Sequence, residues 1–108
     1  MQIEVAREIL PMDVKALEPK MFEAAALMEM LANPARLRIL CLMLEGEMSV
    51  LALAAKCGQS QPAVSHHLKK LRDAELVQTR RDAQTIFYSL KGGDVRAVLQ
   101  TLHGIYCA

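Results

Sequence analysis

The sequence is poor in aromatic residues and has no long apolar run. Its 108 residues include no Trp, two Phe and two Tyr, although 53% of them are hydrophobic. Because the apolar residues are mostly Ala, Leu, Val and Met, the composition favours a mainly helical fold over a large β-sandwich. No run is long enough to span a membrane, and Glu4 and Glu8 stand where a signal peptide would be basic and then apolar. We therefore expect a cytoplasmic protein without a membrane partner.

Motifs typical of enzymes and of zinc sites are also absent from the sequence. It contains no Gly-rich phosphate-binding loop, no nucleophile elbow and no evident pair of catalytic carboxylates. The three cysteines are an odd number for a disulfide framework, and they lack the Cys-x-x-Cys spacing of a zinc knuckle. We expect a protein that is not an enzyme, holds no metal or cofactor and keeps its thiols reduced.

The charges are unevenly distributed along the chain, although the net charge is only +1. Residues 1–33 contain three basic and six acidic side chains, whereas residues 56–82 contain six basic and three acidic ones, together with His66 and His67. A basic segment can bind a polyanion, but on its own it is equally compatible with an ordinary solvated surface. The order of the structural elements must decide between these interpretations.

The hydrophobic pattern predicts one domain over residues 13–108, preceded by a loosely held arm over residues 1–12. We expect helices at about 18–32, 34–44 and 50–56, a helix that begins after Ser60, strands at 76–79 and 84–90, and a last helix after Gly93. Arg80, Arg81 and Asp82 would form the turn between the strands. A tight turn at Gly58 joins the third and fourth helices, so the order predicts a mainly α fold with a β-hairpin wing, the winged helix-turn-helix.

Two of these helices have more apolar surface than one core contact requires. In the first helix, apolar residues surround a stripe formed by Met21, Ala24, Met28 and Leu31. The last helix carries a second stripe, formed by Val95, Val98, Leu99, Leu102 and Tyr106. Such breadth indicates burial against a second chain, so we expect a homodimer that pairs through its first and last helices.

The fourth helix has the two faces expected of a helix that lies in the major groove of duplex DNA. Its apolar stripe consists of Val64, Leu68 and Leu71. The polar side chains away from this stripe can bond base edges or phosphates, and they are Gln61, Ser65, His66 and Lys69. Ser60 and the free amides at the helix start could hold a phosphate.

Residues of the predicted hairpin extend this candidate DNA surface. Arg80, Arg81 and Gln84 could reach the phosphate backbone or the minor groove. His67 lies near the apolar stripe of the fourth helix, so we assign it a structural or phosphate-positioning role rather than base reading. A basic helix followed by a basic hairpin favours double-stranded DNA as the partner over a plain amphipathic helix with a structural hairpin.

Three segments make the sequence resemble a known family. Residues 34–40 (PARLRIL), 60–77 (SQPAVSHHLKKLRDAELV) and 86–90 (IFYSL) resemble the ArsR/SmtB family of dimeric bacterial repressors, with a match over about residues 20–107. Residues 40–44 and 81–85 and the ending Tyr106-Cys107 are similar to its persulfide-sensing branch, the SqrR and BigR type. The resemblance implies a homodimer that binds an inverted-repeat operator of sulfide-detoxification genes and releases it when persulfides modify Cys41 and Cys107.

The family's metal-sensing members have a different set of residues. They carry a Cys-x-Cys pair near the start of the third helix and Asp and His ligands on the last helix. This chain has Ser49 and Leu51 at the first pair of positions and, on the last helix, Asp94 and Arg96, with Arg96 where a His is expected. We therefore expect no metal sensing.

The residues themselves suggest different roles for the three cysteines. Cys41 lies on an apolar stripe, and its position alone predicts core packing, with Arg38 able to lower its pKa only if the guanidinium turns that way. Cys107 falls on the side of His103, away from the apolar stripe, which indicates an exposed or reactive thiol. Cys57, beside a glycine, is interpreted as structural or incidental.

The chemistry at Cys41 and Cys107 depends on their separation in space. A pair slightly too far apart for a direct disulfide would accept a polysulfide bridge instead. The alternatives are a repressor that responds to peroxide or to general thiol oxidation through the same cysteines, and a haem-responsive repressor that uses Cys and His103. From another class, the chain could be a winged-helix protein-interaction module.

Overall fold

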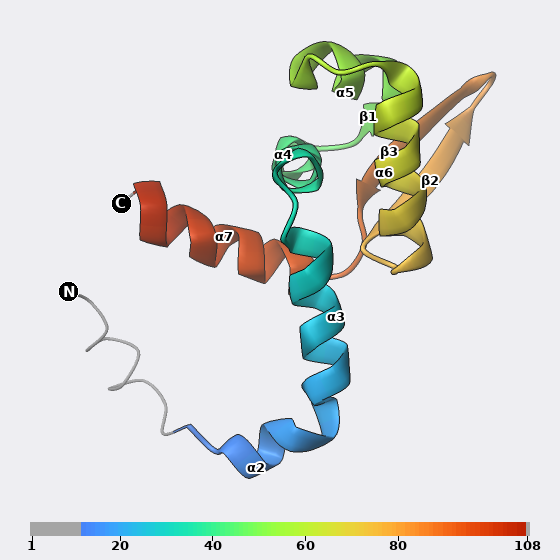
Figure 1. The fold of residues 1–108 in the computed structure, drawn as a ribbon. Helices are drawn as coiled ribbons and strands as arrows, with labels where there is room; N and C mark the ends of the chain where they lie inside the picture. Colours follow the sequence, from blue (N-terminus) through green and yellow to red (C-terminus); the bar gives the residue numbers. More distant parts are fainter. Residues whose placement is uncertain (1–11, 108) are drawn as a thin grey trace.

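The structure is a computed structural model that describes residues 12–107, so the predicted arm lies outside the described residues except for Met12. Figure 1 shows α4, α5 and α6 gathered beside a small sheet, while α3 and α7 extend away from it. The elements are, in order, α2 (Val14–Leu17), the 3₁₀-helix η1 (Glu18–Lys20), α3 (Met21–Leu31), α4 (Pro34–Leu42), the 3₁₀-helix η2 (Met43–Glu45), β1 (Met48–Ser49), α5 (Val50–Cys57), α6 (Gln61–Asp73), β2 (Val77–Asp82), β3 (Thr85–Leu90) and α7 (Asp94–Cys107).

Three helices begin at the capping residues that the sequence predicts. The side chains of Asn33, Ser49 and Ser60 accept hydrogen bonds from backbone amides three residues later, at 3.0, 3.1 and 3.2 Å. These bonds satisfy amides that have no partner inside the helix. Gly58 ends α5 with a left-handed φ of +67°, which turns the chain directly into α6. The predicted helix-turn-helix is therefore confirmed.

One apolar core joins the helices to the sheet. The side chains of this core that are almost fully buried come from every layer of the domain, and they are Ile39, Leu40, Met43, Leu53, Val64, Leu68, Leu71, Val77, Val95 and Leu99. Close packing of this kind leaves a helix little freedom to shift against its neighbours. The core therefore fixes the orientation of α6 relative to α4, α5 and β2.

A single arginine holds the corner between α3 and α4. Arg36 donates hydrogen bonds from Nε to the carbonyl oxygen of Met30, at 2.8 Å, and from Nη2 to that of Glu29, at 3.2 Å. Both carbonyls belong to the last turn of α3, where backbone partners become scarce, and that of Glu29 also accepts a hydrogen bond from the amide of Ala32, at 3.2 Å. The guanidinium therefore caps α3 from the first turn of α4.

The hairpin differs from its prediction in the place of its turn. Arg80, Arg81 and Asp82 were expected in the turn, but they pair with Phe87, Ile86 and Thr85 as the end of β2. The turn consists of residues 83 and 84 alone. The prediction was wrong because charged residues at a strand end look like loop residues when the partner strand is unknown. The strand order β1-β3-β2 also includes the two-residue strand β1, which the sequence did not predict.

The first predicted helix is divided, and its core face differs from the predicted stripe. Residues 18–20 form the 3₁₀-helix η1, so the α-helix begins at Met21. Leu31 is buried and Leu27 and Met30 pack against the core, whereas Met21 and Met28 are 41% and 57% exposed. The predicted stripe therefore lies mainly outside the core of the single chain.

We expect Ala83→Gly to stabilise the domain by about 0.5–1 kcal/mol. Ala83 has a φ of +57°, a left-handed conformation that is unfavourable for a residue with a Cβ atom. The free energy gained by relieving this strain exceeds the free-energy cost of the extra conformational entropy that glycine gives the unfolded chain. Urea unfolding measures the change, and Ala55→Gly, an exposed position within α5, is the matched control that should lower stability by about 1 kcal/mol. A loss of stability in Ala83→Gly would contradict the expectation.

Candidate nucleic-acid interface and thiol pair

The polar face of α6 is exposed along the length of the helix. Gln61, Ser65, His66 and Lys69, all predicted DNA contacts, are exposed, while the apolar stripe of the same helix is buried. Lys69 Nζ lies 3.1 Å from Asp73 Oδ2, an exposed pair that contributes little to stability and can open in favour of a phosphate. The structure therefore brings these four side chains together on one accessible surface.

Ser60 lies at the start of this surface. Its hydroxyl oxygen accepts a hydrogen bond from the amide of Ala63, so the side chain serves first as the helix cap. Pro62 has no amide proton to donate. The backbone amides of Gln61 and of the cap region are therefore the donors that remain at the positive end of the helix dipole. This end of α6 can bind an anion.

His67 lies at the edge of the polar face, and its position fits a structural role better than base reading. It is half-buried, and its Nδ1 atom is buried without a hydrogen-bond partner in the described part of the chain. Burial lowers the pKa of the imidazole, and the positive charges of Arg36, His66 and Lys70 lower it further. The neutral ring is therefore favoured in the folded protein.

Among residues 12–107, the two arginines of the hairpin differ, because Arg80 has ion-pair partners and Arg81 has none. Arg81 and Gln84 are exposed, as a DNA contact requires. Arg80 is exposed too, but its Nη2 lies 2.6 Å from Glu47 Oε1, and its Nε donates to both carboxylate oxygens of Glu47. This bonding lowers the pKa of Glu47. Sequence reasoning missed Glu47 because its place beside the sheet depends on the two-residue strand β1.

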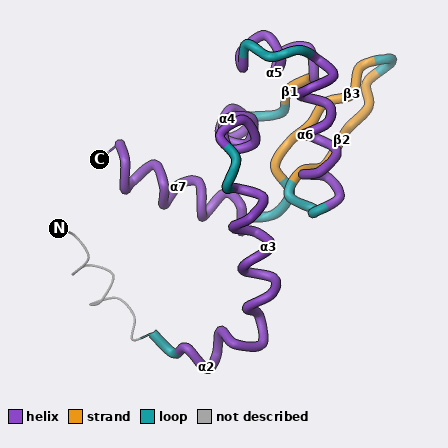
Figure 2. The backbone as a smooth tube through the Cα atoms, viewed as in Figure 1, coloured by secondary structure: helices purple, strands orange, loops and turns teal. Residues whose placement is uncertain are grey.

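α6 and the hairpin lie next to each other. α6 packs against β2, and Figure 2 shows the hairpin projecting to the side of α6 as a narrow arm. This arrangement puts the exposed Arg81 and Gln84 on the arm next to a helix with a polar face. A helix with an exposed polar face and an adjacent projecting hairpin can contact a groove and the flanking backbone at once.

The side chains of Cys41 and Cys107 are both exposed, and neither forms a disulfide within the described residues. The prediction of core packing for Cys41 was wrong, because this side of α4 faces away from the core. Partial burial of the sulfur raises the pKa of Cys41, and negative charge on Cys107 raises it further.

Cys57 and Arg38 belong to a different environment. Cys57 is buried, in agreement with its structural interpretation, and burial raises the pKa of its thiol. Arg38 Nη1 lies 3.5 Å from the carbonyl oxygen of Cys57 and its charge partly offsets that rise. Arg38 therefore turns toward α5, not toward Cys41 as the sequence allowed.

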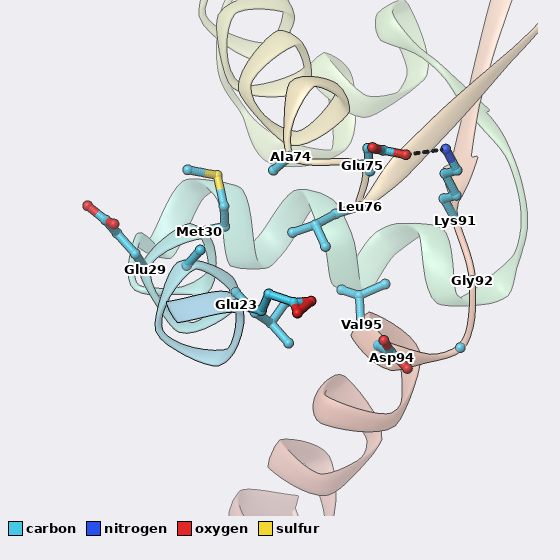
Figure 3. Close-up of a pocket in the computed structure, with 13 residues that line it drawn as sticks. Glu23, Glu29, Met30, Ala74, Glu75, Leu76, Lys91, Gly92, Asp94 and Val95 are labelled. Carbon is cyan, nitrogen blue, oxygen red and sulfur yellow. Dashed lines mark hydrogen bonds and ion pairs between the residues drawn. The ribbon is translucent and has the colours of Figure 1, made fainter. Parts of the chain in front are cut away.

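A cavity of about 510 Å³ lies between α3, the end of α6 and the start of α7. Figure 3 shows Glu23 pointing into it and the ion pair between Glu75 and Lys91, whose Oε1 and Nζ atoms are 2.8 Å apart, at its rim. Glu29 and Asp94 are also part of its lining, so acidic groups predominate. An acidic cavity repels phosphate, and the nucleic-acid interface therefore does not extend into it.

Two further features of residues 12–107 bear on the kinds of site the chain holds. None of their helices is long and apolar enough to cross a membrane. Within the same residues, no three His, Cys, Asp or Glu side chains are placed to hold a metal ion. Arg96, which stands at the family's histidine position, donates from Nη1 to the carbonyl oxygen of Leu44, at 3.3 Å.

A helix-turn-helix with an exposed polar second helix and a basic hairpin beside it defines a winged helix-turn-helix DNA-binding protein. Residues 33–79 match the family model described as bacterial regulatory protein, arsR family. The transcriptional activator HlyU of Vibrio cholerae is 42% identical over 97 residues, which cover 90% of each chain. The chain belongs to the arsR family of bacterial regulatory proteins and is a transcriptional regulator.

Solved structures support the same assignment. The crystal structure of the transcriptional repressor BigR from Xylella fastidiosa superposes with a TM-score of 0.84 at 36% identity, over 90% of this chain and 99% of that one. A homodimeric winged helix-turn-helix DNA-binding domain from Mycobacterium bovis superposes with a TM-score of 0.74 at 30% identity, over 88% of this chain and 86% of that one. The winged helix-turn-helix prediction is therefore confirmed.

We expect Cys107→Ser to lower the pKa of Cys41, because the substitution removes the negative charge that raises it. The measurement is the rate of iodoacetamide alkylation at Cys41 as a function of pH, followed by peptide mass spectrometry. The pH of half-maximal rate should be lower in the variant than in the wild-type protein. Cys57→Ser is the control and should leave the profile of Cys41 unchanged; an identical profile in Cys107→Ser would show that the two thiols do not interact.

We also expect His67 to make the folded state less stable in mild acid. Its pKa is lowered in the folded protein, so the unfolded chain takes up a proton that the folded chain refuses as the pH falls through about 6.5. The contribution of neutral His67 to the free energy of unfolding is therefore fully present above this pH and is lost as the pH falls below it. The urea midpoint should fall less between pH 7.5 and pH 5.5 in His67→Gln than in His66→Gln, which changes an exposed neighbour; equal falls would argue against the assignment.

Proposed function

We propose that this regulator is a homodimeric repressor that binds an inverted-repeat DNA operator through α6 and the hairpin. The observation that carries the proposal is the exposed row of Gln61, Ser65, His66 and Lys69 on a helix whose opposite face is fixed in the core. These side chains match the donor and acceptor pattern of the major groove, and Ser60 and Arg81 flank them as phosphate contacts. Gln84 extends the contact along the hairpin, and His67 supports α6 from its edge.

A second copy of the chain is the partner that best explains the exposed apolar surface. Phe22 on α3 is 92% exposed, and Ile105 and Tyr106 on α7 are 63% and 81% exposed. A cavity of about 400 Å³ between these helices is lined by Met28, Leu31, Ala32, Leu37, Leu102 and Tyr106. Apolar area of this kind is unfavourable in water and favours a homodimer through α3 and α7. Two-fold symmetry would then direct the two α6 helices to an inverted repeat.

Cys41 and Cys107 are the groups through which such a repressor would sense persulfides. Both thiols are exposed, and negative charge on Cys107 raises the pKa of Cys41, while Cys57 is buried. In the proposed reaction each thiolate takes the outer sulfur atom from one organic persulfide and releases one thiol. The persulfide on Cys41 then attacks the Cys107 sulfur and expels hydrogen sulfide, which leaves a trisulfide between α4 and α7. Two persulfide molecules therefore oxidise the two cysteines. They yield two thiols and one hydrogen sulfide, and one of their sulfur atoms stays in the trisulfide.

The bridge would act on DNA binding through the dimer. Cys41 belongs to α4, which packs against α6, and Cys107 belongs to α7, which carries part of the proposed dimer surface. A covalent link between these helices favours conformations in which α7 is drawn toward α4. The distance between the two recognition helices would change, and they would no longer match half-sites spaced by one helical turn.

We expect organic persulfide to release the operator from the wild-type protein. The measurement is fluorescence anisotropy at fixed salt, with a duplex selected from a randomised pool and with mass spectrometry of each sample. Persulfide should abolish binding and place added sulfur between Cys41 and Cys107, whereas peroxide and disulfide should not. Cys41→Ser and Cys107→Ser should remain bound after treatment, and Cys57→Ser should respond like the wild-type protein.

Other outcomes of this experiment separate the alternatives. Equal release by peroxide, with a disulfide at the same cysteines, would make the protein a general thiol-redox repressor. Release by haemin with a haem absorption band would assign haem as the effector. No response to any reagent would make the cysteines structural, and the absence of salt-dependent binding to any duplex would favour a protein-interaction module.

A further inference from the structure

Arg80 is surrounded by more negative than positive charge, although it lies in the basic hairpin. Its guanidinium bonds both carboxylate oxygens of Glu47, and its Nη1 atom lies 4.0 Å from Asp82 Oδ2. One cation between two carboxylates leaves a local net charge of −1. A DNA phosphate that approaches this point would meet repulsion from Glu47 and Asp82, and it would have to displace a two-pronged ion pair.

The same guanidinium also packs on the sheet. Its central carbon lies 4.9 Å from the centre of the Phe87 ring, and Phe87 is the cross-strand neighbour of Arg80 on β3. Phe87 pairs in turn with Ser49 on β1, two residues after Glu47. Arg80 therefore spans all three strands of the sheet, from β2 across the aromatic ring on β3 to the carboxylate that precedes β1. A planar guanidinium suits both contacts, which an ammonium group could not make together.

We propose that Arg80 is a positioning residue, which braces the hairpin against the segment before β1 through Glu47 and Phe87, and not a DNA contact. The inference rests on the proposed DNA-binding function, and it assigns the phosphate contacts of the hairpin to Arg81 and the exposed tip. Within the described residues, the rest of the hairpin is held by the apolar core near its base and by the pairing of β3 with β1, while the pair between Glu75 and Lys91 joins the two strand ends. Glu47 thereby sets the angle at which the wing meets DNA.

Four variants test the brace. Glu47→Gln removes its carboxylate, and Arg80→Lys keeps the positive charge but loses the two-pronged, stacked geometry. Glu75→Gln is the matched control, because it removes the same charge from another exposed ion pair of the hairpin. Arg81→Gln removes the proposed phosphate contact. Each is measured for binding to one duplex of about 30 base pairs over a range of salt concentrations, and for hydrogen exchange of the hairpin amides without DNA.

The brace predicts that Glu47→Gln binds about two- to fivefold more weakly than Glu75→Gln, with the wild-type dependence on salt. Arg80→Lys should behave in the same way, and both should speed amide exchange in residues 80–87 but not in α6. Arg81→Gln should instead lower the salt slope by about 1, the loss of one phosphate contact. Exchange and unfolding measurements establish that the variants are folded.

Other results would overturn the brace. If Glu47→Gln binds more tightly than Glu75→Gln with a steeper salt slope, Glu47 restrains a phosphate contact. If Arg80→Lys kept the wild-type affinity and the wild-type salt slope, DNA binding would depend on the positive charge of Arg80 and not on its bonding geometry. If exchange changes while affinity does not, the ion pair is structural only. Failure of the wild-type protein to bind any duplex would reject the proposed function itself, and unchanged exchange in Glu47→Gln would then reject the brace separately.

Discussion

The buried face of α6 is the contact on which the candidate interface rests. Val64, Leu68 and Leu71 have no measurable exposure, and they pack with Ile39 and Leu40 of α4 at the centre of the core. Because a helix presents its faces at fixed angles, burial of this stripe determines where every polar side chain of α6 points. The rest of the domain, including the sheet and the α5 turn, holds this stripe in place.

Local signals made most of the helical part predictable. Asn33, Ser49 and Ser60 each have a side-chain acceptor three residues before the amide they cap, and Gly58 provides the left-handed residue that ends α5. Capping and termination depend on a few neighbouring residues, so sequence alone is sufficient to place them. The apolar period of α6 separated its buried from its exposed side chains for the same reason.

Features that depend on distant parts of the chain could not be predicted. The partner of Arg80 is 33 residues away in the sequence, and it is brought close by a two-residue strand too short to leave a pattern. Cys41 lies among apolar neighbours, but which side of α4 meets the core is decided by α5, α6 and the sheet together. The core face of α3 was equally unpredictable. Apolar residues surround this helix, so its hydrophobic periodicity does not indicate which face meets the core.

In the proposed function, regulation and assembly both involve α7, which carries Cys107 and part of the proposed dimer surface. α7 contributes Val95 and Leu99 to the core, exposes Ile105 and Tyr106, and ends at Cys107. Its first half is therefore anchored, while its second half has few contacts within the chain. A helix anchored at one end can change direction at low energetic cost when its free end is modified.

The hydrogen bonds of Arg36 couple the orientation of α3 to that of α4. Two hydrogen bonds from α4 to the last turn of α3 oppose a change in the angle between the two helices. α3 bears exposed apolar side chains, and α4 packs on α6. In the proposed homodimer, a shift of α3 caused by the second subunit would therefore pass through this corner to α4 and on to α6, which α4 contacts.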